Sequence, residues 1–255
     1  GTLGLQPGML ATRETVQAMC DVITHRGPDD EGFLVDGALA MGMRRLSIID
    51  LAGGRQPIHN EDGTIAVIQN GEIYNFQELR HELEQKGHRF KTSSDTEAIV
   101  HLYEEYGTAC VKKLRGMFAF AIWDKPRRRL MLARDRLGIK PLYYSLANGR
   151  LLFGSELKSL LAAGLDTTLD PQALHDYLSL TYVPAPATIF RAAHKLLPGT
   201  MLVAENGAVK MERYWELNLD VRTPLRSEAE YVEAVREKVD DAVRSHLVAD
   251  VPLGV

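Results

Sequence analysis

Hydrophobic residues recur at helical spacing in several segments of the chain. The clearest segment is Thr12–Thr24, where apolar residues follow the i, i+3, i+4, i+7 pattern of an amphipathic helix. Further helices are predicted where similar apolar residues follow typical helix starts, including Asn, Ser or Asp caps. These helices carry Phe76, Leu79 and Leu83 after Asn75; Ile99, Leu102, Tyr103 and Tyr106 after Ser94; Leu157, Leu160 and Leu161; the residues after Asp170-Pro171; and Val232, Val235, Val239 and Val243 after Ser227.

Five shorter segments have the composition of β-strands. Met117–Trp123 is apolar at both alternating sets of positions, which predicts a strand covered on both faces. Asp124–Arg127 has turn chemistry, so it favours a hairpin to the next strand. The pattern predicts an α+β fold of stacked, largely antiparallel sheets with helices outside. The predicted strands are Thr64–Gln69, Met117–Trp123, Arg129–Arg134, Pro141–Ser145 and Arg150–Gly154.

One of the three Asn-Gly pairs differs from the others. Asn148-Gly149 and Asn206-Gly207 each lie between strand-like segments and predict two-residue hairpin turns. Asn70-Gly71 instead follows a strand and leads into a predicted helix. An amide side chain and an unhindered backbone N–H at a sheet edge can stabilise an oxyanion. A plain turn is the alternative, and the local sequence does not decide between the two.

Two adjacent arginines, Arg44 and Arg45, lie within an otherwise apolar strand-like segment. An arginine pair in a strand-like segment requires a carboxylate partner; we expect one for Arg45, and a solvent-facing position for Arg44. The acids of Ser93–Glu97 are interpreted as favouring a helix N-terminus. His25–Gly32 is interpreted as a helix end, and the charged run Arg134–Tyr144 as a solvated loop.

Composition and charge narrow the function classes. With 255 residues and 45% hydrophobic residues, the chain has the length and composition of one globular domain or slightly more. A net charge of −4 gives no electrostatic reason to expect nucleic acid or an anionic membrane as a partner. Cys20 and Cys110 lack metal-ligand spacing, so no metal site is predicted. A cytoplasmic protein is the default expectation.

Seven segments of the chain, taken in order, carry a resemblance to one family. The segments are HRGPDDEG (25–32), RLSIIDL (45–51), GGRQP (53–57), NGEIYN (70–75), SDTE (94–97), GMFAFAIWD (116–124) and RDRLGIKPLYY (134–144). They resemble the glutamine-hydrolysing asparagine synthetases, and class II glutamine amidotransferase domains more widely. The resemblance implies an N-terminal-nucleophile hydrolase fold, an αββα four-layer sandwich of antiparallel sheets.

The resemblance also implies roles for individual residues. The family hydrolyses glutamine to glutamate and ammonia, and Asn70 and Gly71 would form the oxyanion hole. Arg45 would bind the α-carboxylate of glutamine, while Asp95 and Glu72 would bind its α-ammonium group. The family opens Met-Cys-Gly-Ile-Ala-Gly, so the nucleophilic cysteine is expected before Gly1 and is absent from the sequence given.

The same resemblance predicts two domains. Residues 1–220 would form the glutamine amidotransferase domain, and 221–255 a linker, around Arg222–Ser227, and the start of a truncated ATP-dependent synthetase domain. This portion would need no cofactor, whereas ATP and Mg would bind in the synthetase domain, with aspartate as acceptor. A different carboxylate acceptor, or a catalytically silent domain, is the alternative, and a homodimer is left open.

Overall fold

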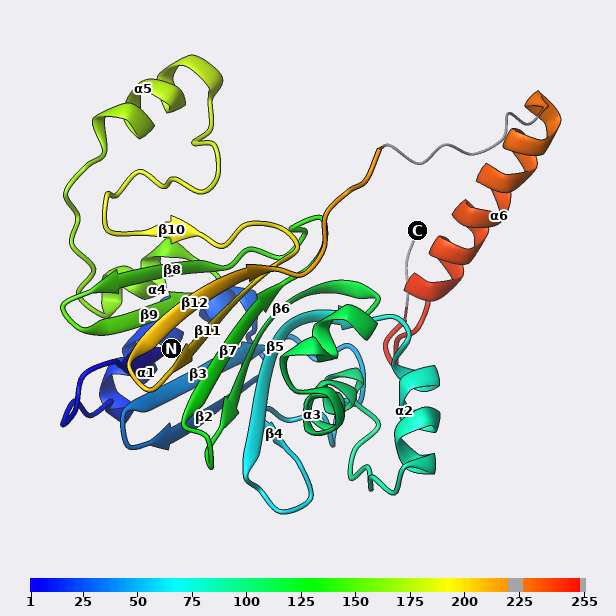
Figure 1. Ribbon diagram of the computed structural model, residues 1–255, viewed down its shortest axis with the longest axis horizontal. Helices are drawn as coiled ribbons and strands as arrows, with labels where there is room; N and C mark the ends of the chain where they lie inside the picture. The colour runs from blue at the N-terminus through cyan, green and yellow to red at the C-terminus, as the bar shows by residue number, and fades with distance from the viewer. Residues whose placement is uncertain (220–226, 253–255) are drawn as a thin grey trace.

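Two six-stranded antiparallel sheets form the centre of the molecule (Figure 1). The computed structural model describes residues 1–219 and 227–252. The first sheet has the order β10-β8-β9-β1-β3-β2 and the second the order β12-β11-β7-β6-β5-β4. The strands are β1 Thr2–Gly4, β2 Asp30–Asp36, β3 Leu39–Arg45, β4 Ile58–His59, β5 Ile65–Ile73, β6 Gly116–Asp124, β7 Arg129–Arg134, β8 Tyr143–Ala147, β9 Arg150–Gly154, β10 His194–Lys195, β11 Thr200–Glu205 and β12 Ala208–Arg213.

Helices cover the outer faces of both sheets. On the first sheet, Val16 and Cys20 of α1 pack on Ala40, and Leu160 of α4 packs on Leu152. Helices α2 and α3 pack on the second sheet. This arrangement confirms the predicted α+β sandwich. The helices are α1 Arg13–Asp21, α2 Phe76–Gln85, α3 Asp95–Tyr106, α4 Leu157–Ala162, α5 Pro171–Leu180 and α6 Glu228–His246, with 3₁₀ turns at Thr24–Arg26 and Gly107–Lys113.

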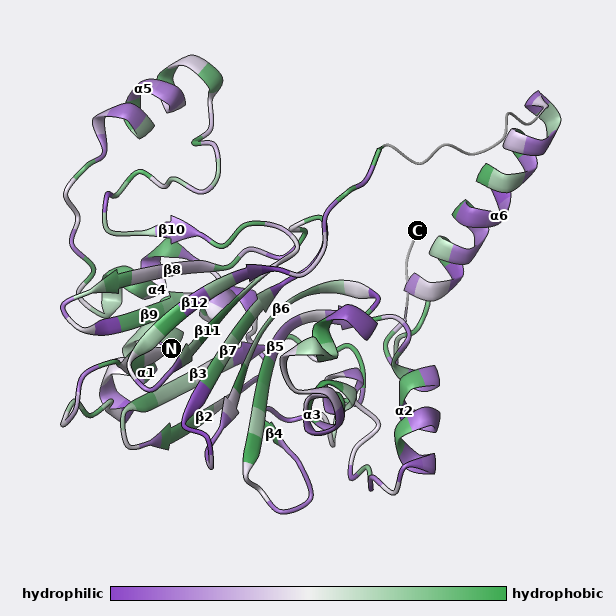
Figure 2. Ribbon diagram, viewed as in Figure 1, coloured by the Kyte–Doolittle hydropathy of each residue, from purple (hydrophilic) through white to green (hydrophobic). Residues whose placement is uncertain are grey.

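A buried apolar layer lies between the two sheets. Leu39 and Leu151 of the first sheet pack with Leu132 and Leu202 of the second, and all four are fully buried. Figure 2 shows this hydrophobic interior, and it shows α2 with a hydrophobic side towards the sandwich. In α2 the buried side chains are Phe76, Leu79 and Leu83, which are the residues that predicted the helix.

The predicted helix starts are confirmed in part. Ser227 and Glu230 form a complete capping box at α6, and Asp170 caps α5. Ser94 caps α3, accepting a hydrogen bond from the backbone of Thr96. Asn75 does not cap α2, because its side chain instead binds the backbone of Lys113 and Arg115 across the fold.

Several predicted element boundaries need correction. The first helix ends at Asp21 instead of Thr24, and a 3₁₀ turn follows. Strand β5 continues past Gln69 to Ile73, because its pairing with β6 runs without interruption through Asn70 and Gly71. The hairpin turns at 148–149 and 206–207 are confirmed, with positive φ at all four residues.

The charged run Arg134–Tyr144 is organised by two partly or fully buried side chains. Asp135 is 1% exposed and accepts hydrogen bonds from the backbone N–H groups of Leu137, Ile139 and Lys140. The Arg134 guanidinium donates to three backbone carbonyls. The interpretation of this segment as a simple solvated loop was therefore wrong.

Two segments of the chain lie wholly or partly outside the described residues. Most of the expected linker Arg222–Ser227 lies outside the described residues, as does the end of the chain beyond residue 252. Among the described helices, none combines the length and the hydropathy needed to cross a membrane.

Truncating the inter-sheet core tests this packing. We expect Leu132→Ala to lower the free energy of unfolding by ~2–5 kcal/mol, because Leu132 is fully buried and its loss leaves a cavity. Leu178→Ala on α5, where the side chain is 75% exposed, should change it by less than ~0.5 kcal/mol. Denaturant unfolding of the two variants measures the difference, and equal losses would contradict the assignment.

Candidate functional site

A cavity of about 320 Å³ lies where β3, β5 and β9 meet the start of α3. All five residues singled out from the sequence line this cavity: Arg45, Asn70, Gly71, Glu72 and Asp95. They come from three segments that are distant in the sequence. The fold therefore brings the predicted site residues together in one place.

The edge of β5 determines how the cavity is lined. Strand β4 pairs only with Ala66 and Val67 of β5, so the rest of this edge has no neighbouring strand. The Gln69 N–H donates to the Gln56 side chain at 2.7 Å, and the Ile73 N–H donates to Asp95 Oδ2 at 2.8 Å. Because N–H direction alternates along a strand, the Gly71 N–H, midway between them, faces the same edge. It is thus directed into the cavity.

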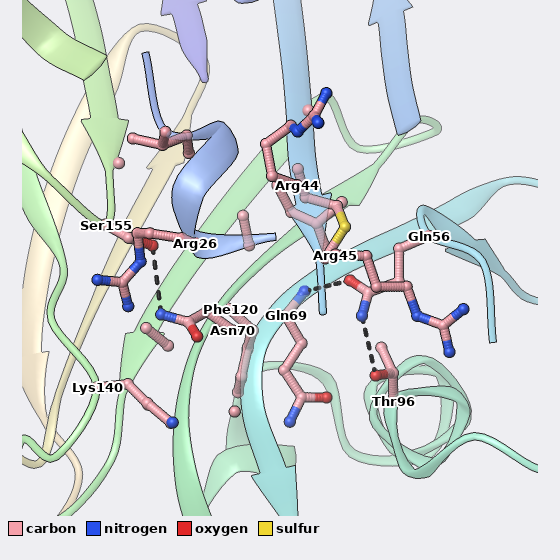
Figure 3. Close-up of a pocket in the computed structure, with 18 of the residues that line it drawn as sticks. Arg26, Arg44, Arg45, Gln56, Gln69, Asn70, Thr96, Phe120, Lys140 and Ser155 are labelled. Atoms are coloured by element: carbon pink, nitrogen blue, oxygen red, sulfur yellow. Dashed lines mark hydrogen bonds between the residues drawn. The ribbon is translucent and has the colours of Figure 1, made fainter. Parts of the chain in front are cut away.

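Gly71 and Asn70 form one wall of this cavity. Gly71 has φ of +145°, and a Cβ there would lie 2.0 Å from the Met117 carbonyl oxygen, so only glycine fits. The Asn70 Nδ2 group is directed at Ser155 Oγ, 3.5 Å away (Figure 3). An amide N–H₂ group and a backbone N–H therefore belong to the lining of one cavity, and both are hydrogen-bond donors.

Arg45 supplies a buried positive charge. Its side chain is held by the backbone carbonyls of Ile49, Asp50 and Leu51, at 2.7–3.4 Å, and the residue is 6% exposed. All three acceptors are uncharged backbone carbonyls, so the described groups that hydrogen-bond to Arg45 do not neutralise its positive charge. The expectation that Arg45 meets a carboxylate of the protein was therefore wrong.

The carboxylate partner belongs to the neighbouring arginine. Arg44 Nη1 lies 2.6 Å from Glu31 Oε2, and Arg44 Nε donates to the Gly27 carbonyl. The Arg44 side chain is only 13% exposed, which corrects its predicted solvent-facing position. Alternation along β3 puts the two guanidinium groups on opposite faces, so the sequence could not assign the partner from the pair alone.

Asp95 supplies a buried carboxyl group at the N-terminus of α3. It is 5% exposed, and burial, reinforced by the charge of nearby Glu72, raises its pKa to about 6 in spite of the Ile73 hydrogen bond. Two carboxyl groups thus face one region of the cavity. Such a pair favours a cation between them, because the cation relieves both desolvation and like-charge repulsion.

Asp50 fixes the loop that holds Arg45. One carboxylate oxygen accepts from the Gly53 N–H and the other from the Ser93 N–H, each at 2.8 Å. The loop after β3 is thereby tied to the segment that precedes Asp95. The spacing between the cationic and anionic parts of the cavity is set by backbone contacts.

Gly1 and Cys20 also line the cavity. The Gly1 nitrogen donates to the Phe153 carbonyl at 2.7 Å. Burial raises the pKa of the Cys20 thiol, and it raises that of Cys110 to about 12. Both cysteines are therefore poor nucleophiles.

Sequence reasoning missed several polar residues of the cavity. Gln56 joins β5 to α3, since it accepts from Gln69 and donates to Thr96 (Figure 3). The Gln69 side chain is buried, and within the described structure neither of its polar atoms has a hydrogen-bond partner. Ser155 contacts Asn70. Single Gln and Ser residues carry no spacing signal, so only the register of the strands reveals them.

Comparisons with known proteins show the family of this chain. Residues 1–215 match the family described as glutamine amidotransferase domain. Asparagine synthetase 1 (glutamine-hydrolysing) of Bacillus subtilis is 43% identical over 243 residues, which cover 94% of this chain and 38% of that protein. Amidase chry2 of Gibberella zeae is 39% identical over 248 residues, covering 95% and 36%.

A solved structure shares the fold. The glutamine phosphoribosylpyrophosphate amidotransferase of B. subtilis superposes with a TM-score of 0.62 at 21% identity, covering 84% of this chain and 48% of that chain. The chain spans less than half the length of each of these relatives. The family match covers most of the described sandwich. This chain therefore belongs to the glutamine amidotransferase domain family.

Proposed function

We propose that the cavity binds free glutamine and that the full-length protein hydrolyses it to glutamate and ammonia. The observation that carries this proposal is the convergence of the buried Arg45 cation, two acids and two amide donors on one cavity. Arg45 would bind the α-carboxylate, and Asp95 with Glu72 the α-ammonium group. The side-chain amide would then reach Asn70 and Gly71. This set of groups selects a free amino acid over a glutamine within a peptide.

The proposed reaction is acyl transfer to a thiol. The sulfur attacks the amide carbon, the carbonyl oxygen becomes an oxyanion, and ammonia leaves as the thioester forms. Water then hydrolyses the thioester to glutamate. The Asn70 Nδ2 group and the Gly71 N–H would stabilise the oxyanion in both steps.

The proposed thiol belongs to a cysteine ahead of Gly1, whose own α-amino group would take the thiol proton. Strand register supports this placement. Thr2 pairs with Ala40 on one side and with Leu152 on the other. Continued in the same register, β1 would run between Gly42 and Gly154, and then between Met43 and Ser155. Since Ser155 contacts Asn70, this path leads to the proposed oxyanion hole.

We expect Asn70→Ala to lower the kcat of glutamine hydrolysis by ~10²–10³, the usual effect of losing one oxyanion donor. The assay uses the full-length protein and measures glutamate release. A kcat close to that of the wild type would contradict the oxyanion role. Arg45→Ala provides the contrast, because loss of a carboxylate contact should mainly raise KM.

The acceptor of the ammonia is proposed to be aspartate, amidated with ATP and Mg in a region outside this chain. The relatives include proteins named asparagine synthetase and one named amidase, so the acceptor needs its own test. We expect the full-length protein, given aspartate, ATP and glutamine, to form asparagine. Consumption of glutamine without asparagine would retain the glutaminase proposal and assign a different acceptor.

The pKa of Asp95 predicts a cost to stability. Its folded value of about 6 exceeds the unfolded value of 3.8, so the stabilising contribution of its proton is complete below 3.8 and is lost as pH rises through about 6. We expect Asp95→Asn to have a free energy of unfolding up to ~3 kcal/mol higher than that of the wild type at pH 7.5, and a similar one at pH 4. Denaturant unfolding at the two pH values measures both differences.

The same variant tests the ammonium site. Glutamine should stabilise the wild type at pH 7.5 and have little effect on Asp95→Asn, because the carboxylate is lost. Asp240→Asn, a substitution on the exposed α6, should leave both properties unchanged. An Asp95→Asn protein that is less stable than the wild type at pH 7.5 would contradict the assigned burial cost.

A further inference from the structure

Two histidines and two glutamates converge outside the cavity. Glu61 lies in the turn between β4 and β5, His88 lies between α2 and α3, and His101 and Glu104 lie on α3. One potential ligand atom from each residue lies within 4.8 Å of every other. Figure 1 shows the β4–β5 hairpin and the α2–α3 connection at the same end of the molecule. Three separate segments therefore contribute to one cluster.

Four nitrogen–oxygen distances in the cluster are close to the ligand separations of a tetrahedral metal site. His101 Nδ1 lies 3.1 Å from Glu104 Oε2 and 3.4 Å from Glu61 Oε2. His88 Nδ1 lies 3.6 Å from Glu104 Oε2 and 3.5 Å from Glu61 Oε1. Zinc–ligand bonds of ~2.0–2.1 Å in a tetrahedron separate the ligand atoms by ~3.3 Å. The four nitrogen–oxygen separations, in which Glu61 offers a different oxygen to each histidine, lie close to this value.

The outer nitrogens of both histidines face further carboxylates. His88 Nε2 lies 3.1 Å from Glu105 Oε1, and His101 Nε2 lies 3.5 Å from Glu97 Oε1. The Glu105 carboxylate would hold the proton of His88 on Nε2 and leave its Nδ1 lone pair directed at the centre of the cluster, and the Glu97 carboxylate lies behind the His101 ring. Metal-binding histidines usually have this arrangement.

The two glutamates are also oriented by hydrogen bonds. Glu104 Oε1 accepts from Asn60 Nδ2 at 2.8 Å, which leaves Oε2 facing both histidines. Glu61 Oε1 accepts from the Arg89 backbone N–H, also at 2.8 Å. His101 is fully buried, whereas the carboxylates of Glu61 and Glu104 reach the surface and leave an entry path for an ion.

We propose that Glu61, His88, His101 and Glu104 bind a divalent transition-metal ion of the zinc type. Two imidazole nitrogens and two carboxylate oxygens are ligands that suit zinc. A bound ion would join the β4–β5 turn and the α2–α3 connection to α3. The role is structural, since the cluster is separate from the residues that line the cavity. This proposal does not depend on glutamine hydrolysis.

Zinc retention by untagged protein tests the site. After removal of metals with a chelator and incubation with Zn²⁺, we expect the wild type to keep about one zinc per chain through gel filtration, measured by mass spectrometry of the metal. His88→Gln and Glu104→Gln should each bind Zn²⁺ at least tenfold more weakly. With Co²⁺ in place of zinc, the wild type should show the intense visible absorption of a tetrahedral site.

His81→Gln is the matched control, because His81 lies on the exposed face of α2 and contacts Gln85. It should bind Zn²⁺ as the wild type does, and circular dichroism should show that all three variants are folded. Wild-type protein without stoichiometric zinc would overturn the proposal and leave an ion-pair network. Equal zinc affinity in the wild type, His88→Gln and Glu104→Gln would also overturn it.

Discussion

The unpaired edge of β5 is the constraint on which the candidate active site depends. A strand edge that is buried must find partners for its N–H groups, because an unsatisfied buried donor is costly. Two side chains meet this need, Gln56 at Gln69 and Asp95 at Ile73. Between them the Gly71 N–H faces the cavity. A protein carbonyl at this point would complete the sheet but would remove the donor that an oxyanion requires.

The charges of the cavity are held apart by backbone groups. Arg45 is fixed by three carbonyls of the loop after β3, and Asp95 is fixed by the β5 edge and the start of α3. Asp50 connects these two supports through Gly53 and Ser93. Because the cation and the acids satisfy backbone groups, they do not neutralise each other. This separation costs stability in the free protein and leaves both charges open to a zwitterionic ligand.

The sequence predicted the elements of the fold better than their ends. Apolar periodicity located the helices, and the two-sided apolar strand at 117–123 predicted the layered fold. The hydrophobic pattern did not predict that β5 continues to Ile73, since that boundary depends on pairing with β6. Asn75 looked like a cap locally, but its side chain binds the backbone at 113 and 115. Such contacts arise only when distant segments meet.

The site residues, too, could be predicted only where the signal was local in the sequence. The Asn70-Gly71 pair could be singled out because a helix, and not a second strand, follows it in the sequence. That it shares one site with Arg45, Glu72 and Asp95 was implied only by the family resemblance, and the fold brings these residues to one cavity. Arg44 and Arg45 are adjacent, and nothing in their spacing tells which one pairs with an acid. The sequence did not predict the cluster formed by Glu61, His88, His101 and Glu104. Its members come from three segments at intervals that match no metal-binding motif.

Glu97 connects the two sites that emerge from this structure. Although burial opposes ionisation, hydrogen bonds from His101, Lys91 and Thr92 lower the pKa of Glu97 to about 2. Its carboxylate thus holds the backbone at 91–92, just before Ser94 and Asp95, while it faces His101 Nε2. The Glu97 carboxylate therefore links the backbone ahead of Asp95 to the side of α3 that carries His101.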